Sequence, residues 1–458
     1  MSSPIPLSEE PTVDQATVRR AALAGLIGTM LEQYDFVIYG TASAIIFNTL
    51  FFPRVSPAVG VIASMATYAV GFAARPLGSL FFARFGDRMG RKWVMIATLF
   101  LMGTATFCIG LIPSYYTIGI WAPIMLLILR IMQGFGAGAE QAGGVTLLAE
   151  TVKRSRRGLY CALVFAGAAL GSVLGAVAWI VAQSLTDHAL NTWGWRAVFW
   201  TSAVVTVAAY ILRRHLAESP VFQETQAARI GRDDTPIGDV LRHGRPALWR
   251  IFLINMGSNA QSYIYQVFMG SYLVTWLGMK PKFIPNVLLI GALASCIFTV
   301  FSGWMTDRVG RKPVIISVLV FLFLFPIPAF AMLNTKNPVF ITIAVVLGFM
   351  IAGYGTVGSQ GAFYAEMFGS RYRYAGISLA REFSSVFGGG IAPLVCSALV
   401  TKFAGSWWPV AVYMMVFIGL SLIAAIASPE TRGRDLRLEQ DAVGKPVEQL
   451  SVEGSMAS

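Results

Sequence analysis

Seven ionisable side chains interrupt stretches of sequence that are otherwise apolar, and their types suit proton and anion chemistry. They are Glu32, Asp35, Arg75, Arg130, Glu140, Arg381 and Glu382. A carboxylate held in a low-dielectric cavity can take up and release a proton near neutral pH. A guanidinium stays charged and grips a carboxylate through two parallel hydrogen bonds. The set therefore combines groups able to carry a proton with groups able to hold an organic anion.

The apolar stretches around these residues are long enough to cross a lipid bilayer. The chain has 458 residues, of which 56% are hydrophobic and 13% are charged, and its mean hydropathy is +0.64. About 20 apolar residues in a helix match the hydrocarbon core of a membrane. We expect twelve membrane-spanning helices and an all-α membrane protein. The expected spans lie near residues 21–47, 58–82, 93–112, 118–144, 158–183, 195–212, 248–276, 285–305, 313–333, 338–362, 375–400 and 406–427.

Charges inside such spans are costly unless they are compensated. At roughly 2.5–3.5 kcal/mol each, seven unpaired charges would cost about 20 kcal/mol, more than a typical stability margin. They must therefore pair, face water or change protonation, and we expect them to line a central cavity near the membrane midplane.

The distribution of positive charge predicts the orientation. The formal net charge is +12, which could suggest a nucleic-acid partner. With both termini on one side, however, 26 of the 35 Lys and Arg residues fall on that side and six on the other. This asymmetry is the positive-inside pattern of membrane proteins, so we expect cytoplasmic termini and no nucleic-acid partner.

A repeated motif indicates that the chain consists of two related halves. Gly86–Lys92 reads GDRMGRK and Thr306–Lys312 reads TDRVGRK, with Asp87 and Asp307 separated by 220 residues. A weaker echo relates Ala149-Glu150 and Arg157 to Ala365-Glu366 and Arg373. Duplicated halves of six spans are typical of one large class of membrane transporters. We expect a cytoplasmic N-terminal tail at 1–20, a six-helix bundle at 21–212, a cytoplasmic linker at 213–247, a second six-helix bundle at 248–427 and a cytoplasmic C-terminal tail at 428–458.

The repeated motif resembles the signature G-x-x-x-D-R-x-G-R-K of the major facilitator superfamily. The second copy matches it fully from Gly303 to Lys312. Other stretches resemble the metabolite:proton symporter family, with the shikimate branch nearest. They include residues 32–36, 70–78, 129–135, 193–196, 218–222 and 388–393, and for the shikimate branch 51–57 and 366–374. The resemblance implies the major facilitator fold and an inner-membrane, multi-pass protein of bacteria.

The resemblance also implies roles for individual residues. Asp35, with Glu32 beside it, is expected to carry the proton. The two motif loops are expected to form a gate that holds the cytoplasmic side shut in the outward-open state. The gate residues are Asp87, Arg88 and Arg91 in the first loop and Asp307, Arg308 and Arg311 in the second.

Helical geometry adds candidate residues for substrate binding. Arg130 and Gln133 lie on a polar stripe of the fourth span, and Tyr39 shares a face with Glu32 and Asp35. We expect Arg130 to hold the anionic group of the substrate, with Arg381 as second choice. The other candidates are Asn255, Asn259 and Gln266 in the seventh span and Glu382 in the eleventh. Arg75 and Glu140 are expected either to join this charge network or to form ion pairs that only fix packing.

These features predict a secondary active transporter that imports a small polar organic acid together with protons by alternating access. The acid is expected to be a shikimate-like hydroxylated carboxylate or a dicarboxylate. Two alternatives remain: proton-coupled uptake of a zwitterion such as proline or betaine, and a nontransporting nutrient receptor on the same fold. The three histidines lack metal-ligand spacing and no Walker motif occurs, so we expect no enzyme activity, no metal and no cofactor. We expect a monomer.

Overall fold

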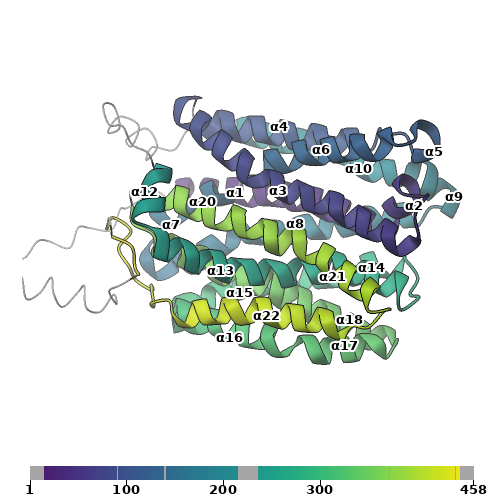
Figure 1. Cartoon of the computed structure of the whole chain (residues 1–458). Coiled ribbons are helices and arrows are strands. Elements are labelled where there is room, and N and C mark those ends of the chain that lie inside the picture. The colour runs from purple at the N-terminus through teal and green to yellow at the C-terminus, as the bar shows by residue number, and fades with distance from the viewer. Residues whose placement is uncertain are drawn as a thin grey trace, which may run out of the picture.

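The computed structural model describes residues 15–89, 91–138, 141–214, 236–370, 372–438 and 440–443. Side chains are described for these residues except 15–17, 20–21, 24, 83–89, 91–92, 95, 141–143, 147, 212–214, 236–237 and 239. The described residues are almost entirely helical and contain no strand. Figure 1 shows the long helices running side by side along one direction.

Ten α-helices come from the first half of the chain. They are α1 (Gln15–Ile45), α2 (Phe47–Phe51), α3 (Pro57–Met89), α4 (Arg91–Ile109), α5 (Tyr115–Ile118), α6 (Trp121–Ala137), α7 (Gln141–Thr151), α8 (Arg157–Gln183), α9 (Asp187–Ala189) and α10 (Trp195–Arg214). The second half supplies α12 (Pro236–Arg242), α13 (Arg245–Tyr263), α14 (Met269–Thr275), α15 (Phe283–Val309), α16 (Arg311–Leu324), α17 (Pro326–Asn334), α18 (Pro338–Phe349), α19 (Thr356–Met367), α20 (Arg373–Ser385), α21 (Ala392–Lys402) and α22 (Trp408–Ile426).

Three long helices of the second half pass through a π-helical segment. The segments are Ile264–Phe268 (η3), Met350–Gly355 (η4) and Val386–Ile391 (η5), and they join α13 to α14, α18 to α19 and α20 to α21. Such segments often mark functional positions in helices. Between α16 and α17 the axis bends by 42°, where Pro326 cannot donate a backbone hydrogen bond.

Each of the twelve expected ranges is largely helical among the described residues. Within the described part of the chain, however, six helices are long and apolar enough to cross a membrane, or seven if the bent pair α16 and α17 counts as one span. The six are Pro57–Phe82, Arg154–Gln183, Phe283–Val309, Pro338–Met367, Arg373–Lys402 and Trp408–Ile426. The fold is therefore all-helical and multi-pass, while the count of twelve spans stays a proposal.

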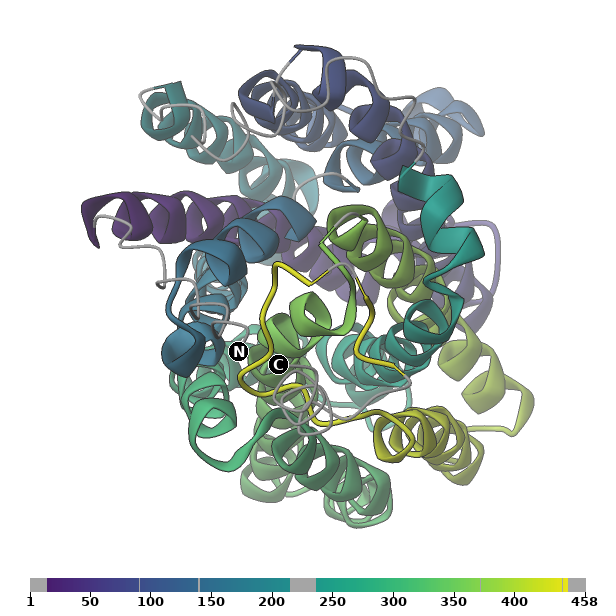
Figure 2. The same ribbon diagram turned by 90° about the vertical axis from the view of Figure 1, so that its left-hand side faces the viewer.

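The two halves meet along several helices. α8 packs against both α1 and α15, and α3 packs against α20, η5 and α21. Gly389 permits the contact between α3 and η5, because an added Cβ would lie 2.5 Å from the ring of Phe72. Viewed end-on, the first-half helices in purple and blue gather mainly on one side and the second-half helices in green and yellow on the other (Figure 2).

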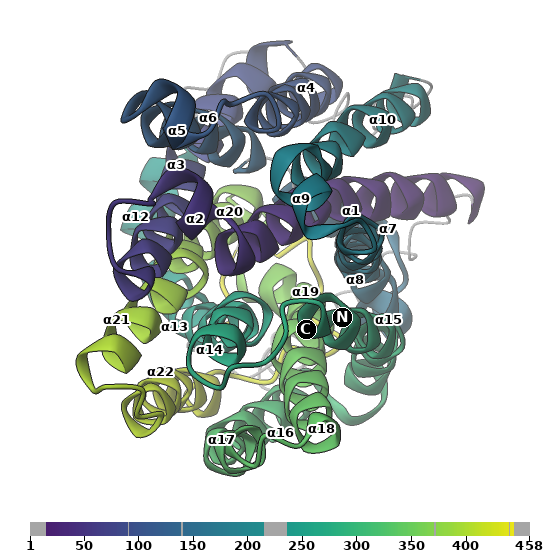
Figure 3. The same ribbon diagram turned by 90° about the vertical axis from the view of Figure 1, so that its right-hand side faces the viewer.

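The two ends of the bundle differ. Residues 428–438 and 440–443, here called the tail segment, cross one end between the halves (Figure 2). We call this the tail end. The short helices α2, α5 and α9 lie at the opposite end, which faces the viewer in Figure 3.

Candidate functional site

Arg130, on α6, lies inside a cluster of aromatic rings that come from α1 and α3. Its side chain is fully buried. The guanidinium carbon lies 4.5 Å from the ring centre of Phe36, 4.2 Å from that of Tyr39 and 4.8 Å from that of Tyr68. Ring faces attract cations, so the three rings keep the charge in place without neutralising it. Gly71 leaves room for it, because a Cβ there would lie 2.5 Å from the Arg130 Nε atom.

A chain of hydrogen bonds connects Arg130 to Asp35. Nη1 of Arg130 donates to Oε1 of Gln133, and Nε2 of Gln133 donates to the hydroxyl of Thr106 over 2.7 Å. That hydroxyl donates in turn to Oδ2 of Asp35 over 2.8 Å. Gln133 sits one helical turn after Arg130 on α6, while Thr106 belongs to α4 and Asp35 to α1. The predicted anion ligand and the predicted proton carrier are therefore linked through two neutral side chains.

Some donors in this cluster have no acceptor. Nε and Nη2 of Arg130 and the hydroxyl of Tyr68 are buried and make no hydrogen bond. Buried donors are normally satisfied, so three unsatisfied donors on two adjoining side chains indicate a place for an oxyanion. Among the described residues, no group of three or more His, Cys, Asp or Glu side chains could hold a metal ion.

Glu32, Arg75 and Glu382 form a buried ion triad between the halves. Nη1 of Arg75 lies 2.7 Å from Oε1 of Glu32, and its Nε lies 2.8 Å from Oε2 of Glu382. All three side chains are buried. Arg75 therefore ties α1 and α3 to α20, and the structure brings it together with two of the predicted site residues. Arg381 lies close enough for electrostatic interaction with Glu382, Glu32 and Arg75.

A small pocket reaches the two carboxylates of α1 from the side. Its volume is about 10 Å³, which suits a single water molecule. Glu32 and Asp35 line it together with Ser202 and Thr206 of α10. The remaining lining residues are Gly28, Leu31, Leu99, Met102, Gly103 and Val205. The pocket therefore offers room for one water molecule beside Glu32 and Asp35.

The candidates of the seventh span do not contact Arg130. Nδ2 of Asn255 donates to the hydroxyl of Ser384 over 2.6 Å, and Asn259 is half-buried beside Gly388. Gln266 accepts a hydrogen bond of 3.2 Å from Gln33 and donates over 3.3 Å to Ser172. Gln266 thus links η3 of the second half to α1 and α8 of the first half, and its role as a substrate ligand stays a prediction.

At the tail end, Asp307 joins the second half to the first. Its two carboxylate oxygens accept the backbone N–H groups of Gly158 and Leu159 over 2.9 and 2.8 Å, at the N-terminus of α8. A carboxylate at this position is stabilised by the positive end of the helix dipole. Nη1 of Arg311 lies 2.6 Å from Asp307, and its Nε lies 3.1 Å from Oε2 of Glu366. Two of the predicted gate residues therefore lie in one network that bridges the halves.

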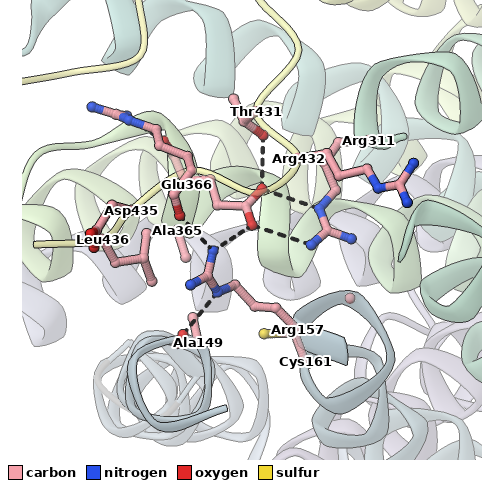
Figure 4. Close-up of polar contacts among 12 residues, drawn as sticks. Ala149, Arg157, Cys161, Arg311, Ala365, Glu366, Thr431, Arg432, Asp435 and Leu436 are labelled. Carbon is pink, nitrogen blue, oxygen red and sulfur yellow. Dashed lines mark hydrogen bonds and ion pairs between the residues drawn. The ribbon is translucent and has the colours of Figure 1, made fainter. Parts of the chain in front are cut away.

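Crossed ion pairs extend this network with the symmetry of the duplication, and Figure 4 shows the pair that Arg157 forms with Glu366. Arg157 donates to the carbonyl of Ala149 in its own half and pairs with Glu366 of the other half over 2.8 Å. Arg373 in turn donates to the carbonyl of Ala365 and pairs with Glu150 over 2.7 Å. Each arginine thus holds its own half through a carbonyl eight residues earlier and the opposite half through a glutamate.

The tail segment closes over this network. Glu430 accepts the backbone N–H groups of Arg311 and Lys312 at the start of α16 over 2.9 and 3.0 Å. Thr431 donates to Oε2 of Glu366 over 2.9 Å, and Asp435 pairs with Arg154 of the first half over 2.7 Å. Arg434 donates to the carbonyl oxygens of Glu366 and Gln440. Burial lowers the pKa of Arg434 to about 10, so this guanidinium remains charged at neutral pH.

Both the sequence and the fold of this chain resemble those of known proteins. The sequence matches the Major Facilitator Superfamily over residues 25–393 and 251–451. The chain belongs to the major facilitator superfamily. The structure resembles the proton:xylose symporter XylE of E. coli with a TM-score of 0.72 at 18% identity, covering 93% of this chain and 99% of that one. The expected all-helical fold is therefore confirmed at the level of the superfamily.

The relatives in this superfamily are transporters. The shikimate transporter of Escherichia coli is 35% identical over 93% of this chain and 97% of its own length. The E. coli inner membrane metabolite transport protein YhjE is 33% identical over 91% of this chain and 95% of its own length. The proline/betaine transporter of Salmonella typhimurium is 33% identical over 95% of this chain and 88% of its own length. The expectation of a transporter rather than an enzyme is confirmed.

Four residues that were predicted for the charge network and the gate have side chains that the structure does not describe. Glu140 and the side chains of Asp87, Arg88 and Arg91 lie outside the described residues. Arg308 is exposed, and its guanidinium stacks over Trp304 at 4.6 Å instead of entering the bridging network. Its backbone carbonyl accepts a hydrogen bond from Arg432 over 2.8 Å.

Sequence reasoning missed Tyr68 and Thr106. Both are polar and neither is charged, so a search for costly charges passes over them. Their places along the helices gave no signal either, because Thr106 lies three residues before the end of α4 and Tyr68 lies in the first half of α3. The glutamates and arginines of the crossed pairs were visible as the weaker echo between the halves.

Proposed function

We propose that this chain is a secondary active transporter that imports a small polar organic acid together with protons by alternating access. The hydrogen-bond chain from Arg130 through Gln133 and Thr106 to Asp35 carries the proposal. It connects a buried cation that has free donors to a buried carboxylate that has no ion pair among the described residues. An arriving carboxylate satisfies the free donors of Arg130, and a proton on Asp35 accompanies it.

The proposed topology follows the distribution of positive charge. Twelve spans form two six-helix bundles, residues 21–212 and 248–427, joined by the linker 213–247. The tails 1–20 and 428–458 lie in the cytoplasm, which makes the tail end the cytoplasmic side. Relatives from bacteria include one named as an inner membrane protein, and we assign this chain to the same membrane. We propose that it works as a monomer.

The proposed cycle uses the two networks in turn. Proton and substrate enter from the outside while the crossed pairs and the tail segment hold the cytoplasmic side shut. Binding at the centre then lets the halves rock around the Glu32, Arg75 and Glu382 triad. The crossed pairs separate, their charged groups become hydrated, and substrate and proton leave to the cytoplasm. Asp307, Arg311 and their partners close the side again.

The class of substrate follows from the chemistry of the donors. Arg130 and Tyr68 offer N–H and O–H donors, which suit a carboxylate, and the relative named shikimate transporter indicates a hydroxylated acid. A zwitterion such as proline or betaine is the alternative from the proline/betaine relatives. Its cationic end would need an aromatic face, yet the faces of Phe36, Tyr39 and Tyr68 already hold Arg130. No observation favours a nontransporting receptor.

Ligand-induced thermal stabilisation of the purified protein tests the binding half of this proposal. Organic acids including shikimate should raise the Tm, more at pH 5.5 than at pH 7.5, because protonation of Asp35 accompanies binding. Arg130→Gln should abolish the shift. The exposed Arg54 offers a matched control, and Arg54→Gln should keep it. Failure of every carboxylate to stabilise the wild-type protein would refute Arg130 as the anion ligand.

Tyr68→Phe should weaken substrate binding without weakening the fold. The hydroxyl has no partner in the empty site, so its removal costs the folded protein nothing. A hydrogen bond to a charged group contributes about 1.5–3 kcal/mol, so Kd should rise roughly 10- to 100-fold. Calorimetry of binding measures this, and Tyr116→Phe at an exposed position is the control. An unchanged Kd would place the substrate carboxylate away from Tyr68.

A further inference from the structure

The acidic and basic side chains that the structure describes at the centre of the bundle are equal in number. Three are carboxylates and three are guanidiniums. They are Glu32, Asp35 and Glu382, with Arg75, Arg130 and Arg381. The triad accounts for three of them, Asp35 and Arg130 interact electrostatically, and Arg381 interacts with Glu382 and Glu32. When all six are ionised, the charges of these described side chains sum to zero.

Net charge in this environment is costly, because an uncompensated buried charge loses its hydration. Counted over these six described side chains, the empty site is neutral with Asp35 ionised. A proton alone leaves one positive charge, and a monoanion alone leaves one negative charge. One proton and one monoanion together restore neutrality. Two states are therefore favoured during the change of access: empty without a proton, and loaded with one proton and one negative charge.

Asp35 is the carboxylate best placed to accept this proton. Glu32 and Glu382 share the guanidinium of Arg75, whereas Asp35 accepts its hydrogen bond from the neutral Thr106. Arg130 and Gln133 of α6 face Asp35 from one side, and Glu32 of its own helix faces it as well. From α10 the nearby groups are Ser202 and Thr206, which share the water-sized pocket. A water molecule in that pocket can pass the proton to the carboxylate and take it up again after release.

We infer that the transporter carries one monocarboxylate with one proton and that the overall movement is electroneutral. This inference rests on the proposed function and deepens it by selecting the substrate class. A fully ionised dicarboxylate would leave a negative charge in the loaded site. A zwitterion with a proton would leave a positive charge. Both should be transported poorly, and the two unbalanced states should block leakage of proton or anion alone.

Transport by the full-length protein in proteoliposomes tests the inference. Shikimate serves as the monocarboxylate, succinate as the dicarboxylate and proline as the zwitterion. An inward proton gradient should accumulate shikimate about tenfold per pH unit, since one pH unit is 1.36 kcal/mol per proton. A potassium diffusion potential of either sign, set with valinomycin, should neither drive accumulation nor change its final level.

The outcomes separate the inference from the proposed function. A transport current that follows the potential, or proton-driven accumulation of succinate above shikimate, would overturn electroneutral monoanion transport and leave organic-acid import standing. Proton-driven accumulation of proline above shikimate would overturn both. Absence of proton-driven accumulation for all three would overturn both. Electroneutral accumulation of shikimate supports both.

Discussion

Asp35→Asn should abolish concentrative uptake while keeping exchange of substrate across the membrane. Asparagine cannot carry the proton, so the proton gradient no longer does work on the substrate. The variant site is positive when empty and neutral when it holds a monoanion, so the loaded site can still change access. With a proton gradient of two pH units, accumulation should fall from about 100-fold in the wild type to about onefold. Uptake and counterflow of shikimate in proteoliposomes measure the two activities.

The control for this variant is the same change at an exposed carboxylate. Asp187 lies on the short helix α9 and is exposed, so Asp187→Asn should retain both activities. Concentrative, pH-dependent uptake by Asp35→Asn would remove Asp35 from the coupling step. Loss of exchange as well as uptake would contradict the charge balance at the centre.

Glu366→Gln should open the tail end of the protein. Glu366 is fully buried and faces both Arg157 and Arg311, so the change leaves two buried guanidiniums without their shared carboxylate. Breaking a buried ion pair costs about 3–5 kcal/mol, which applies to the closed arrangement. Separation of the halves moves Arg157 of the first half away from this site, so the open arrangement avoids the cost of burying it unpaired. The open population should therefore rise by roughly 10²- to 4 × 10³-fold.

Cys161 reports this opening without any added label site. It is fully buried one turn after Arg157 on α8, and its Cβ lies 3.1 Å from where a Cβ on Gly361 would be. Maleimide labelling of Cys161, followed by peptide mass spectrometry in detergent, should speed up strongly in Glu366→Gln. Thr431→Val removes one hydrogen bond to Glu366 and should act in the same direction but more weakly. Unchanged labelling in both variants, with folding intact, would show that this network does not hold the tail end closed.

The fold was predictable because its signal is spread along the whole chain. Long apolar stretches, the asymmetry of positive charge and the repeated motif each constrain it independently, and membership of the superfamily agrees with them. The exact helices were less predictable. The π-helical segments and the bend before Pro326 depend on packing between helices, which periodicity along one helix does not encode.

The charged residues of the candidate site could be predicted from the sequence, but the residues that they contact could not. Placing Asp35 and Arg130 required only the cost of burying a charge. Which arginine would pair with Glu32 depended on how α1 meets α3, and the answer was Arg75, which the sequence left open between a structural and a functional role. Tyr68 and Thr106 were not predicted as site residues, because neutral polar residues are common in such helices. Asn255 donates its hydrogen bond to Ser384, and this contact depends on the packing of α13 against α20.

Uptake driven by a proton gradient is the most direct test of proton-coupled organic-acid import. Purified wild-type protein in proteoliposomes, with the outside at pH 5.5 and the inside at pH 7.5, should accumulate labelled shikimate against its gradient. A protonophore should collapse the accumulation to the equilibrium level, and Arg130→Gln should show none. Accumulation that persists with the protonophore present, or uptake that never exceeds the equilibrium level in the wild type, would contradict the account.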